Sequence, residues 1–378
     1  MDANIILTGA TGILGSHLMY ELIALKKVGR ITGQLVILGR GSKKYHLTKR
    51  IQRMLLCDCA PSYLHQFSLE MLMNELVVVS CDLRNIGDAA DRLKRYLSDA
   101  IVIHAGSSVN LGTDDIAEAQ VLQNNHKATL RLLETCLPAI SQFIYISTAF
   151  ASGHRAGKID DDFLSLQDKQ FRNHYEKYKS LTESHVVEMC ELHGKVWQIL
   201  RPSIISGRLI DNPKYVIPKY LVFYLVSDFF SKMAQRYRDK QPLIRIMLNA
   251  ETSLNVVPVD YAAKAIVNAM LNRTNRQLNI VSTESISVTT MFKIMLNKSG
   301  YHNSAFVNEM PTELNEVEKF YYKWIGGQLN QYLNTSPSSY KTTQLIKLMQ
   351  DVSEPQIGEY FGEIIEYAHN DNYKQRVI

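Results

Sequence analysis

The stretch Asn4–Ser16, with the sequence NIILTGATGILGS, constrains the fold of this chain more than any other feature. Three apolar residues run directly into glycines at positions 9, 12 and 15, and apolar residues at helical spacing follow. Glycines at such positions let a strand turn sharply into a helix and let the backbone approach a ligand closely. The free N–H groups of the first helical turn then suit a pyrophosphate. The stretch therefore predicts a dinucleotide site, and a strand–helix turn without a ligand is the simpler alternative.

Continuous apolar runs alternate with amphipathic helical segments along the first part of the chain. The expected strands cover residues 5–7, 35–38, 76–79, 100–103 and 142–146. Strands of a parallel sheet are apolar throughout because helices cover both faces of the sheet. Ligands of such sheets bind at the carboxyl ends of the strands. We therefore predict an α/β protein built on a Rossmann-type doubly wound parallel sheet.

The end of the second expected strand indicates which nicotinamide cofactor the chain prefers. Arg40 stands at this position, and Arg50 follows ten residues later. An acidic residue here suits the ribose hydroxyl of NAD, whereas an arginine accommodates the 2′-phosphate of NADP. A guanidinium matches a phosphate in both geometry and charge. Arg40 therefore favours NADPH, while Arg50 taken alone is equally typical of a solvent-facing arginine.

The candidate catalytic residues follow the fifth expected strand. Thr148 closes that strand, and Tyr175 and Lys179 lie on a predicted helix, one turn apart on the same face. We expect the Lys179 ammonium to lower the pKa of Tyr175, because a positive charge stabilises the phenolate. Thr148 would give a carbonyl oxygen a second hydrogen bond. A Tyr-x-x-x-Lys pair is otherwise typical of a surface helix, and the rival phenol Tyr178 has no lysine four residues later.

With these motifs, the chain resembles an extended short-chain dehydrogenase/reductase. Within that superfamily it is most similar to the fatty acyl-CoA reductase and thioester reductase-like branch, also called the male-sterility family. The resemblance covers roughly residues 4–285. Its motifs are TGATGILG, the Arg40/Arg50 pair, CDL at 81–83, HAGS at 104–107, NHKAT at 125–129, STAF at 147–150, YEKYK at 175–179, LRPSIISG at 200–207 and VPVDY at 257–261. The last two motifs separate this branch from many relatives.

The resemblance implies roles for particular residues. Those implied at the pyrophosphate and the 2′-phosphate are Gly9, Thr11, Gly12, Ile13, Gly15, Arg40 and Arg50. Those implied at the adenine, the nicotinamide-side ribose and the nicotinamide are Asp82, Leu83, Ala105, Gly106, Ser107, Pro202 and Ser203. The implied catalytic set is Thr148, Tyr175, Lys179 and Asn125. Asn125 would have a structural and proton-relay role near Lys179, which would also bind the ribose, and we expect no metal site.

Some positions depart from the family pattern. Tyr178 stands where serine is usual, His126 and Ala128 replace valine and glycine, and residues 106–107 replace an alanine pair. None of these changes removes a chemical group that the mechanism requires. Tyr178 has the bulk to narrow the pocket.

We expect two domains of unequal size. Residues 1–207 and 251–284 would form the NAD(P)-binding domain, and residues 208–250 and 285–378 a smaller, mostly helical substrate-binding domain. The most apolar segment, residues 215–230, contains Lys219 and Asp228 and is too short to span a bilayer. It is expected to be a buried helix that could accept an acyl chain, with membrane-surface contact as the minor alternative. The aromatic patch at 319–325 is expected to pack rather than to bind a ligand.

Composition and charge bear on the size of the core, the kind of partner and the redox compartment. The 378 residues are 46% hydrophobic, which is enough for a large core. The net charge of +5 suits an anionic cofactor or substrate but gives no argument for a nucleic-acid partner. The five cysteines lack paired CxxC spacing, so we expect free thiols in a reducing cytoplasm.

These inferences combine into one predicted activity with two alternatives. We predict an NADPH-dependent reductase that converts an acyl thioester, presented by CoA or a carrier protein, to the aldehyde. Tyr175 and Thr148 would hold the carbonyl oxygen while hydride is transferred. The first alternative is an NAD(P)-dependent hydroxysteroid-like dehydrogenase or nucleotide-sugar epimerase or dehydratase. The second is a non-catalytic NADPH-binding protein of the same fold. The acyl chain and the oligomeric state are left open.

Overall fold

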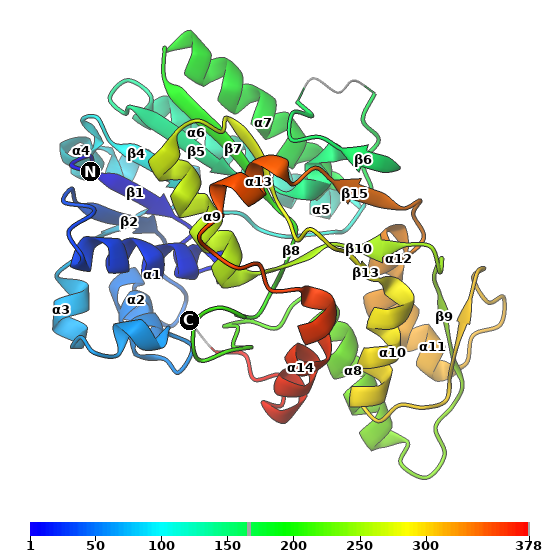
Figure 1. The fold of residues 1–378 in the computed structure, drawn as a ribbon. Helices are drawn as coiled ribbons and strands as arrows, with labels where there is room; N and C mark the ends of the chain where they lie inside the picture. Colours follow the sequence, from blue (N-terminus) through cyan, green and yellow to red (C-terminus); the bar gives the residue numbers. More distant parts are fainter. Residues whose placement is uncertain (165–167, 377–378) are drawn as a thin grey trace.

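The computed structural model describes residues 1–164 and 168–376, and it shows a parallel sheet between two layers of helices (Figure 1). The seven strands lie in the order β12-β7-β5-β4-β1-β2-β3, and each neighbouring pair is parallel. Their bounds are β1 Ile5–Thr8, β2 Leu35–Gly39, β3 Leu76–Ser80, β4 Ile101–His104, β5 Gln142–Ile146, β7 Val196–Pro202 and β12 Gln277–Ile280. The order runs outward from β1 in both directions, so the predicted doubly wound Rossmann-type sheet is confirmed.

Alternate residues of the strands enter cores on opposite faces of the sheet. Ile5 and Leu7 of β1 join the core with α1, α2 and α9, whereas Ile6 joins the core with α4, α6 and α7. The bounds of these helices are α1 Ile13–Lys27, α2 Leu47–Leu56, α4 Gly87–Leu97, α6 Ala128–Cys136, α7 His174–Leu192 and α9 Val259–Asn272. Since both cores exclude water, the strands carry apolar residues on both faces.

The helical segment between β4 and β5 is interrupted. Helix α5 (Asp115–Val121) leads into a π-helical turn over Leu122–Lys127, and α6 follows. A π-helical turn accommodates an extra residue within a helix and is frequent at functional sites. Here it buries two polar side chains, those of Asn125 and His126.

A second hydrophobic core lies beyond the sheet, in the lower right of Figure 1. Its main helices are α8 Phe223–Arg236, α10 Val288–Lys298, α11 Glu316–Tyr321, α12 Gly327–Leu333 and α14 Ile357–Asn370. The helix expected over residues 215–230 begins only at Phe223, because the preceding stretch is irregular and Val222 has a φ of 54°. The side chains of Tyr220, Phe223 and Phe230 pack within this core.

Short strand pairs connect the second core to the sheet. The parallel pairs are β8 Ile204–Ser206 with β11 Val256–Pro258, β9 Ile244–Met247 with β14 Ser304–Val307, and β6 Gly157–Ile159 with β15 Ser338–Tyr340. The antiparallel pair is β10 Ser253–Leu254 with β13 Ile286–Ser287. After β15 the chain returns to the sheet, where Leu345 of α13 (Thr343–Leu348) packs in the core of α9. The division into two domains at 207, 251 and 285 stays a prediction.

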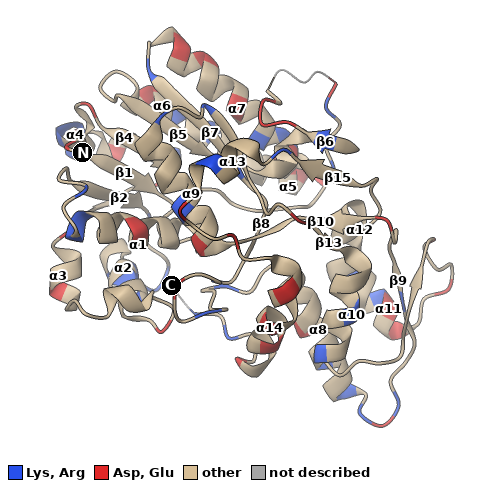
Figure 2. Ribbon diagram, in the orientation of Figure 1, with Lys and Arg blue, Asp and Glu red and all other residues tan. Residues whose placement is uncertain are grey.

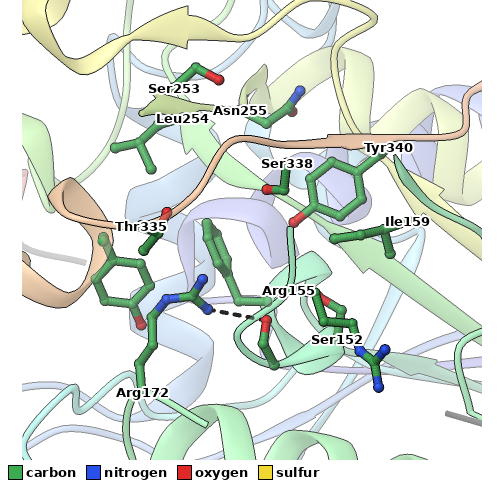
Figure 3. A pocket seen from close by; sticks show the side chains of 13 residues that line it. Ser152, Arg155, Ile159, Arg172, Ser253, Leu254, Asn255, Thr335, Ser338 and Tyr340 are labelled. Carbon is green, nitrogen blue, oxygen red and sulfur yellow. Dashed lines mark hydrogen bonds between the residues drawn. The ribbon is translucent and has the colours of Figure 1, made fainter. Parts of the chain in front are cut away.

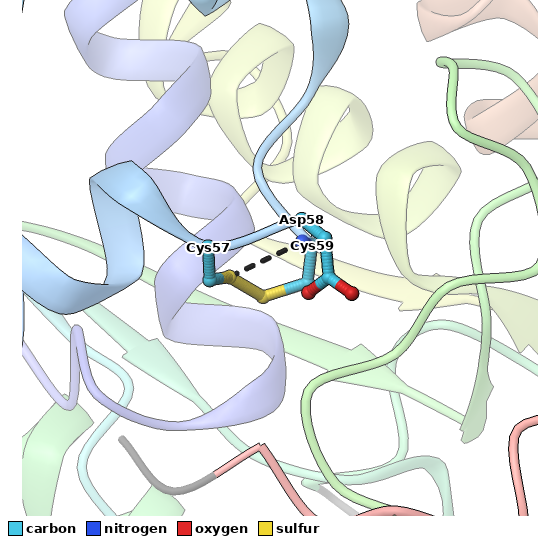
Figure 4. Close-up of side chains that lie close together, drawn as sticks. All are labelled: Cys57, Asp58 and Cys59. Atoms are coloured by element: carbon cyan, nitrogen blue, oxygen red, sulfur yellow. Dashed lines mark hydrogen bonds between the residues drawn. A yellow bond between two sulfur atoms is a disulfide. The ribbon is translucent and has the colours of Figure 1, made fainter.

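Two of the five cysteines are not free thiols. Cys57 and Cys59 form a disulfide in the turn after α2, across a Cα–Cα distance of 5.1 Å that such a bond requires (Figure 4). The prediction of free thiols is therefore wrong for this pair and holds for Cys81, Cys136 and Cys190. The pair and Asp58 present potential ligand atoms within 4.8 Å of one another. Sulfurs bonded to each other are not the thiolates that metals bind.

The surface charges are mixed. Figure 2 shows basic and acidic residues interspersed over the elements of both cores, in keeping with 42 basic and 37 acidic residues. Among the described residues, no helix combines the length and the apolar character needed to cross a membrane.

Candidate active site

The glycine turn between β1 and α1 is shaped by close backbone contacts. Gly9 has a φ of +76°, and an added Cβ there would lie 2.5 Å from the carbonyl carbon of Ala105. A Cβ on Gly15 would lie 2.1 Å from the carbonyl oxygen of Gly9. Gly12 precedes the first residue of α1, whose N-terminus has neither a side-chain cap nor an acidic residue in the first turn. These features fit a dinucleotide pyrophosphate, since the first-turn N–H groups are not used by a side chain.

A buried hydrogen-bond chain joins the ends of β1 and β4 behind this turn. The Thr8 hydroxyl lies 2.6 Å from His104 Nδ1 and accepts a hydrogen bond from Gly106 N. Burial lowers the pKa of His104 to about 3, so the ring is neutral. Its Nε2 lies 2.9 Å from the hydroxyl of Thr129, which itself donates to the Asn125 carbonyl. The chain is consistent with a proton on Nε2 and fixes Gly106 at the site.

Asn125 holds the loop that follows β4. Its Oδ1 accepts from Ser108 N at 2.8 Å, and its Nδ2 donates to Ser108 O at 2.8 Å. Both polar atoms of the amide are thus used on one residue of the loop that carries Ala105 to Ser107. The observed contacts of Asn125 fit the structural role that the family resemblance implies. Its role as a proton relay stays a prediction.

Lys179 binds the end of β5 from the second turn of α7. Its Nζ donates to the Ile146 carbonyl at 2.8 Å and lies 5.9 Å from the centre of the Tyr175 ring. Helix α7 begins at His174, and the side chain of Asn173 caps it by accepting from Glu176 N. Burial lowers the pKa of Lys179 to about 7.

The pKa of Tyr175 is raised by burial, so the expected lowering by Lys179 is wrong for this structure. The Lys179 amine is directed at a backbone carbonyl of β5, and desolvation of the phenolate is the largest influence on the pKa of Tyr175. A hydrogen bond from the Ser107 hydroxyl acts in the opposite direction, to lower the pKa. Tyr175 is therefore a protonated phenol, which suits the role of an acid.

Thr148 lies two residues beyond the carbonyl that holds Lys179. Its side chain is buried, and its Oγ1 accepts from Phe150 N at a long 3.4 Å. Tyr175 lies at this edge of the sheet, because it contacts Ser107 in the loop after β4 and lies beside Lys179, whose amine binds the end of β5. The structure thus gathers the predicted catalytic residues around the carboxyl ends of these two strands.

Arg40 and Arg50 share one corner at the end of β2. Arg50 Nη1 donates to the Arg40 carbonyl at 2.9 Å, and burial and the charge of Arg40 lower the pKa of Arg50. The Arg40 side chain is 63% exposed and lies 3.8 Å from Asp82. Asp82 is bound at 2.6 Å by Arg84, which holds the pKa of this carboxyl at about 2. The corner has an excess of positive charge.

Sequence reasoning missed several residues near these positions. Burial lowers the pKa of Lys219, and the charge of Arg50 lowers it further, so Lys219 is a further cation within electrostatic reach of the arginine corner. Ser203 Oγ donates to Asn255 Oδ1 at 2.7 Å, so Asn255 fixes one residue implied beside the nicotinamide. Pro202, the other, ends β7. The contact between Thr8 and His104 could have been predicted, because both are polar residues at the ends of neighbouring strands. No local sequence pattern connects Lys219 with the cofactor site.

Tyr178 belongs to the contact between α5 and α7. Its hydroxyl donates to Glu118 at 3.0 Å, and Lys177 binds the same carboxylate. These contacts give no support to the expected narrowing of the pocket by Tyr178.

Comparison with known proteins agrees with this geometry. The profile of an NAD-binding family described as "Male sterility protein" matches residues 7–266. The chain belongs to this family. With its Rossmann fold, it is an NAD(P)-dependent enzyme of the extended short-chain dehydrogenase/reductase type. No curated protein matches the sequence.

Solved structures with the same fold include reductase domains and epimerases. The terminal R domain from the myxalamid PKS-NRPS pathway has a TM-score of 0.68 at 17% identity, over 100% of this chain and 92% of that one. A thiolation-reductase di-domain from an archaeal non-ribosomal peptide synthetase has a TM-score of 0.66 at 16% identity, over 99% of this chain and 77% of that one. UDP-glucuronic acid 4-epimerase from Bacillus cereus has a TM-score of 0.62 at 19% identity, over 98% of this chain and 96% of that one.

Proposed function

We propose that this enzyme reduces an acyl thioester of CoA or a carrier protein to the aldehyde, with NADPH as the reductant. The proposal is carried by the contact of Lys179 with the end of β5, with Tyr175 beside it and Thr148 two residues further along the chain, in a member of the male-sterility family. The likeness to a terminal R domain and to a thiolation-reductase di-domain supports a carrier-bound thioester. The residues implied at the cofactor keep the roles given above as part of this proposal.

The chain's own residues act on the carbonyl oxygen. NADPH, when bound, supplies the hydride. Thr148 and Tyr175 donate hydrogen bonds to the oxygen as negative charge develops there, and Tyr175 gives it a proton. The raised pKa of Tyr175 keeps that proton available at neutral pH. With the hydride on the carbonyl carbon and the proton on the oxygen, the product is a hemithioacetal. Its C–S bond then breaks as the hydroxyl proton passes, directly or through Tyr175, to the sulfur, which gives the aldehyde and the free thiol.

The arginine corner supports NADPH over NADH. Arg40, Arg50 and Lys219 supply positive charge where an NAD-specific site presents a carboxylate to the ribose. Asp82 is paired with Arg84 and stands at the adenine side in our proposal. The same corner argues against the alternative of an epimerase that retains NAD, although such enzymes share the fold.

The test is NADPH oxidation by the purified protein with a panel of acyl-CoA and carrier-bound acyl substrates. We expect aldehyde to form in step with NADPH consumption, faster than with NADH. Tyr175→Phe should lower kcat by about a hundredfold or more, because it removes the acid, while NADPH affinity stays nearly constant. Tyr178→Phe is the matched control, since its phenol binds Glu118 one turn away.

Three outcomes would contradict the proposal. The first is that no thioester is consumed, whether free or carrier-bound. The second is equal loss in both tyrosine variants. The third is interconversion of nucleotide sugars without added reductant, which would favour the epimerase alternative.

A further inference from the structure

The polar pocket under strand β15 is filled by contacts of the protein with itself (Figure 3). Arg172 Nη1 donates to the Gly153 carbonyl at 3.3 Å, and the buried Glu176 balances its charge. The Arg172 Nε donates to the Gln331 carbonyl, also at 3.3 Å. This arginine therefore holds the start of α7 in place, and its charge is already neutralised within the protein.

The turn after α2 carries a bond that can change its chemical state. Cys57 caps the C-terminus of α2 and is bonded to Cys59, so the disulfide closes a ring that contains Asp58 (Figure 4). The ring spans three residues, and a disulfide across so short a loop removes little chain entropy from the unfolded state. Stabilisation of the fold is therefore only a small part of what this bond contributes.

The two sulfurs differ in their access to a reductant. Cys57 is half-buried, whereas Cys59 is 1% exposed. Reduction begins when a thiolate attacks an accessible sulfur of the disulfide, and exposed disulfides are the labile ones. Cys57 is therefore the point of attack.

Asp58 connects the ring to the C-terminal segment. Its two carboxylate oxygens accept from Arg376 Nε and Nη2, at 2.9 and 3.2 Å. The Arg376 side chain is 8% exposed and also binds Asp371, through Nη1 at 2.7 Å. Asp58 is thus one of two carboxylates that neutralise a largely buried guanidinium.

The C-terminal segment in turn binds the residues on either side of Lys219. Arg376 N donates to the Pro218 carbonyl at 3.1 Å. The Gln375 side chain accepts from Tyr220 N and donates to Tyr220 O, each at 3.2 Å. Lys219 lies between these two anchored residues, within electrostatic reach of the arginine corner. Its position therefore depends on the C-terminal segment.

Reduction disturbs this arrangement at its centre. Two sulfurs that are no longer bonded must separate to van der Waals distance. Because Cys59 is enclosed by the protein, the displacement falls on Cys57 and Asp58. Cys57 ends the helix that carries Arg50, and Asp58 holds Arg376.

We propose that Cys57 and Cys59 form a redox-active site, and that their reduction by a dithiol weakens the binding of NADPH at the arginine corner. The inference rests on the proposed function, because it takes that corner as the site of the 2′-phosphate. In the oxidised protein, the ring holds Asp58 on Arg376, and the C-terminal segment holds Lys219 in place. In the reduced protein, the turn relaxes and the 2′-phosphate loses part of its positive surroundings.

The exchange balances with an external dithiol as the reductant. One of its thiolates attacks Cys57 Sγ, the bond to Cys59 breaks, and the released Cys59 thiolate takes up a proton. The second thiol of the reductant, as its thiolate, then displaces Cys57, whose thiolate is also protonated. Two thiols remain on this protein, and the reductant carries the disulfide.

The test measures the dissociation constants of NADPH and NADH for the oxidised protein and for the protein treated with dithiothreitol. Alkylation and mass spectrometry report the state of the cysteine pair. We expect reduction to weaken NADPH binding about tenfold, as the loss of one charged hydrogen bond implies, and to leave NADH affinity nearly unchanged. NADH has no 2′-phosphate, so it separates an effect on the corner from a general loosening of the fold.

Three variants test the connection. The double variant Cys57→Ser/Cys59→Ser should bind NADPH as the reduced protein does and should not respond to dithiothreitol. Arg376→Gln should also remove the response, because it cuts the link from Asp58 to the segment around Lys219. Lys374→Gln is the matched control, since Lys374 is exposed on the same segment, and it should keep the full response.

The outcomes separate this inference from the proposed function. An NADPH affinity that is equal in both redox states overturns the inference and leaves the proposed function standing. Equal weakening of NADPH and NADH also overturns it, as does a pair that stays oxidised in dithiothreitol. A failure to bind NADPH in either state contradicts the proposed function as well. If Arg376→Gln does not fold, the comparison of the two redox states of the unaltered protein decides.

Discussion

Lys179 shows how strongly one buried side chain depends on its surroundings. The sequence places it one helical turn from Tyr175, and from that spacing we expected it to lower the pKa of the phenol. The structure buries Lys179, half-buries Tyr175 and turns the amine towards the Ile146 carbonyl, so desolvation dominates both pKa values. Spacing along a helix therefore predicts proximity, whereas the charge state depends on solvent exclusion by the whole fold.

The lowered pKa of Lys179 predicts a pH-dependent stability. The folded protein releases this proton near pH 7, but the unfolded chain keeps it to about pH 10.4. Between these values the unfolded state binds more protons, so this group makes the free energy of unfolding rise with pH. Below pH 7 the buried amine of Lys179 is charged, and its full destabilising effect on the folded state is present.

Lys179→Met removes this effect. We expect the unfolding free energy of the variant, relative to the cofactor-free parent, to decrease as the pH rises from about 7 to about 10. Denaturant titrations of both proteins at several pH values measure this. A difference that is constant with pH would contradict the prediction. Lys177→Met, at an exposed position on the same helix, is the control.

At the scale of elements, the π-helical turn is the feature that the sequence pattern concealed. Residues 115–137 have helical apolar spacing throughout, and the interruption coincides with Asn125, whose side chain reaches the loop after β4. The strands, in contrast, were predicted well. Their unbroken apolar runs reflect burial on both faces, which is a local and strong signal.

Asn125→Ala should loosen the loop that carries Ala105 to Ser107. Two hydrogen bonds to Ser108 are lost, and at a net value of about 0.5–1.5 kcal/mol each the cost is about 1–3 kcal/mol of stability. Because Ser107 also contacts Tyr175, we expect kcat to fall as well. Chemical denaturation and steady-state kinetics measure both effects. Asn110→Ala, in the exposed part of the same loop, should change neither by a comparable amount.

At the scale of the whole molecule, the C-terminal part of the chain braces the start of the catalytic helix. Tyr332 of α12 accepts a hydrogen bond from Asn173 at 2.7 Å and also binds Glu176. Arg172 stacks over the Tyr332 ring, and Phe150 packs against its edge. Residues more than 150 positions apart thereby set the position of Tyr175.

Tyr332→Phe tests this long-range contact. The ring still packs, but the buried Glu176 and Asn173 lose a partner, so we expect a loss of about 1–3 kcal/mol in unfolding free energy. The pKa of Glu176 should rise further, because the phenol hydrogen bond lowers it in the parent protein. Tyr360→Phe, on the partly exposed side of α14, is the control. Equal stability of the two variants would show that the hydroxyl contributes nothing.

The sequence by itself determined the glycine turn, the doubly wound sheet and the family, because each depends on short-range patterns. Residue types at strand ends also indicated the cofactor site around the glycine turn and Arg40. Only the tertiary structure decided the disulfide, the neighbourhood of Lys219, the raised pKa of Tyr175 and the polar pocket under β15. These features depend on burial and on contacts between distant segments, and neither quantity is encoded in the spacing of neighbouring residues.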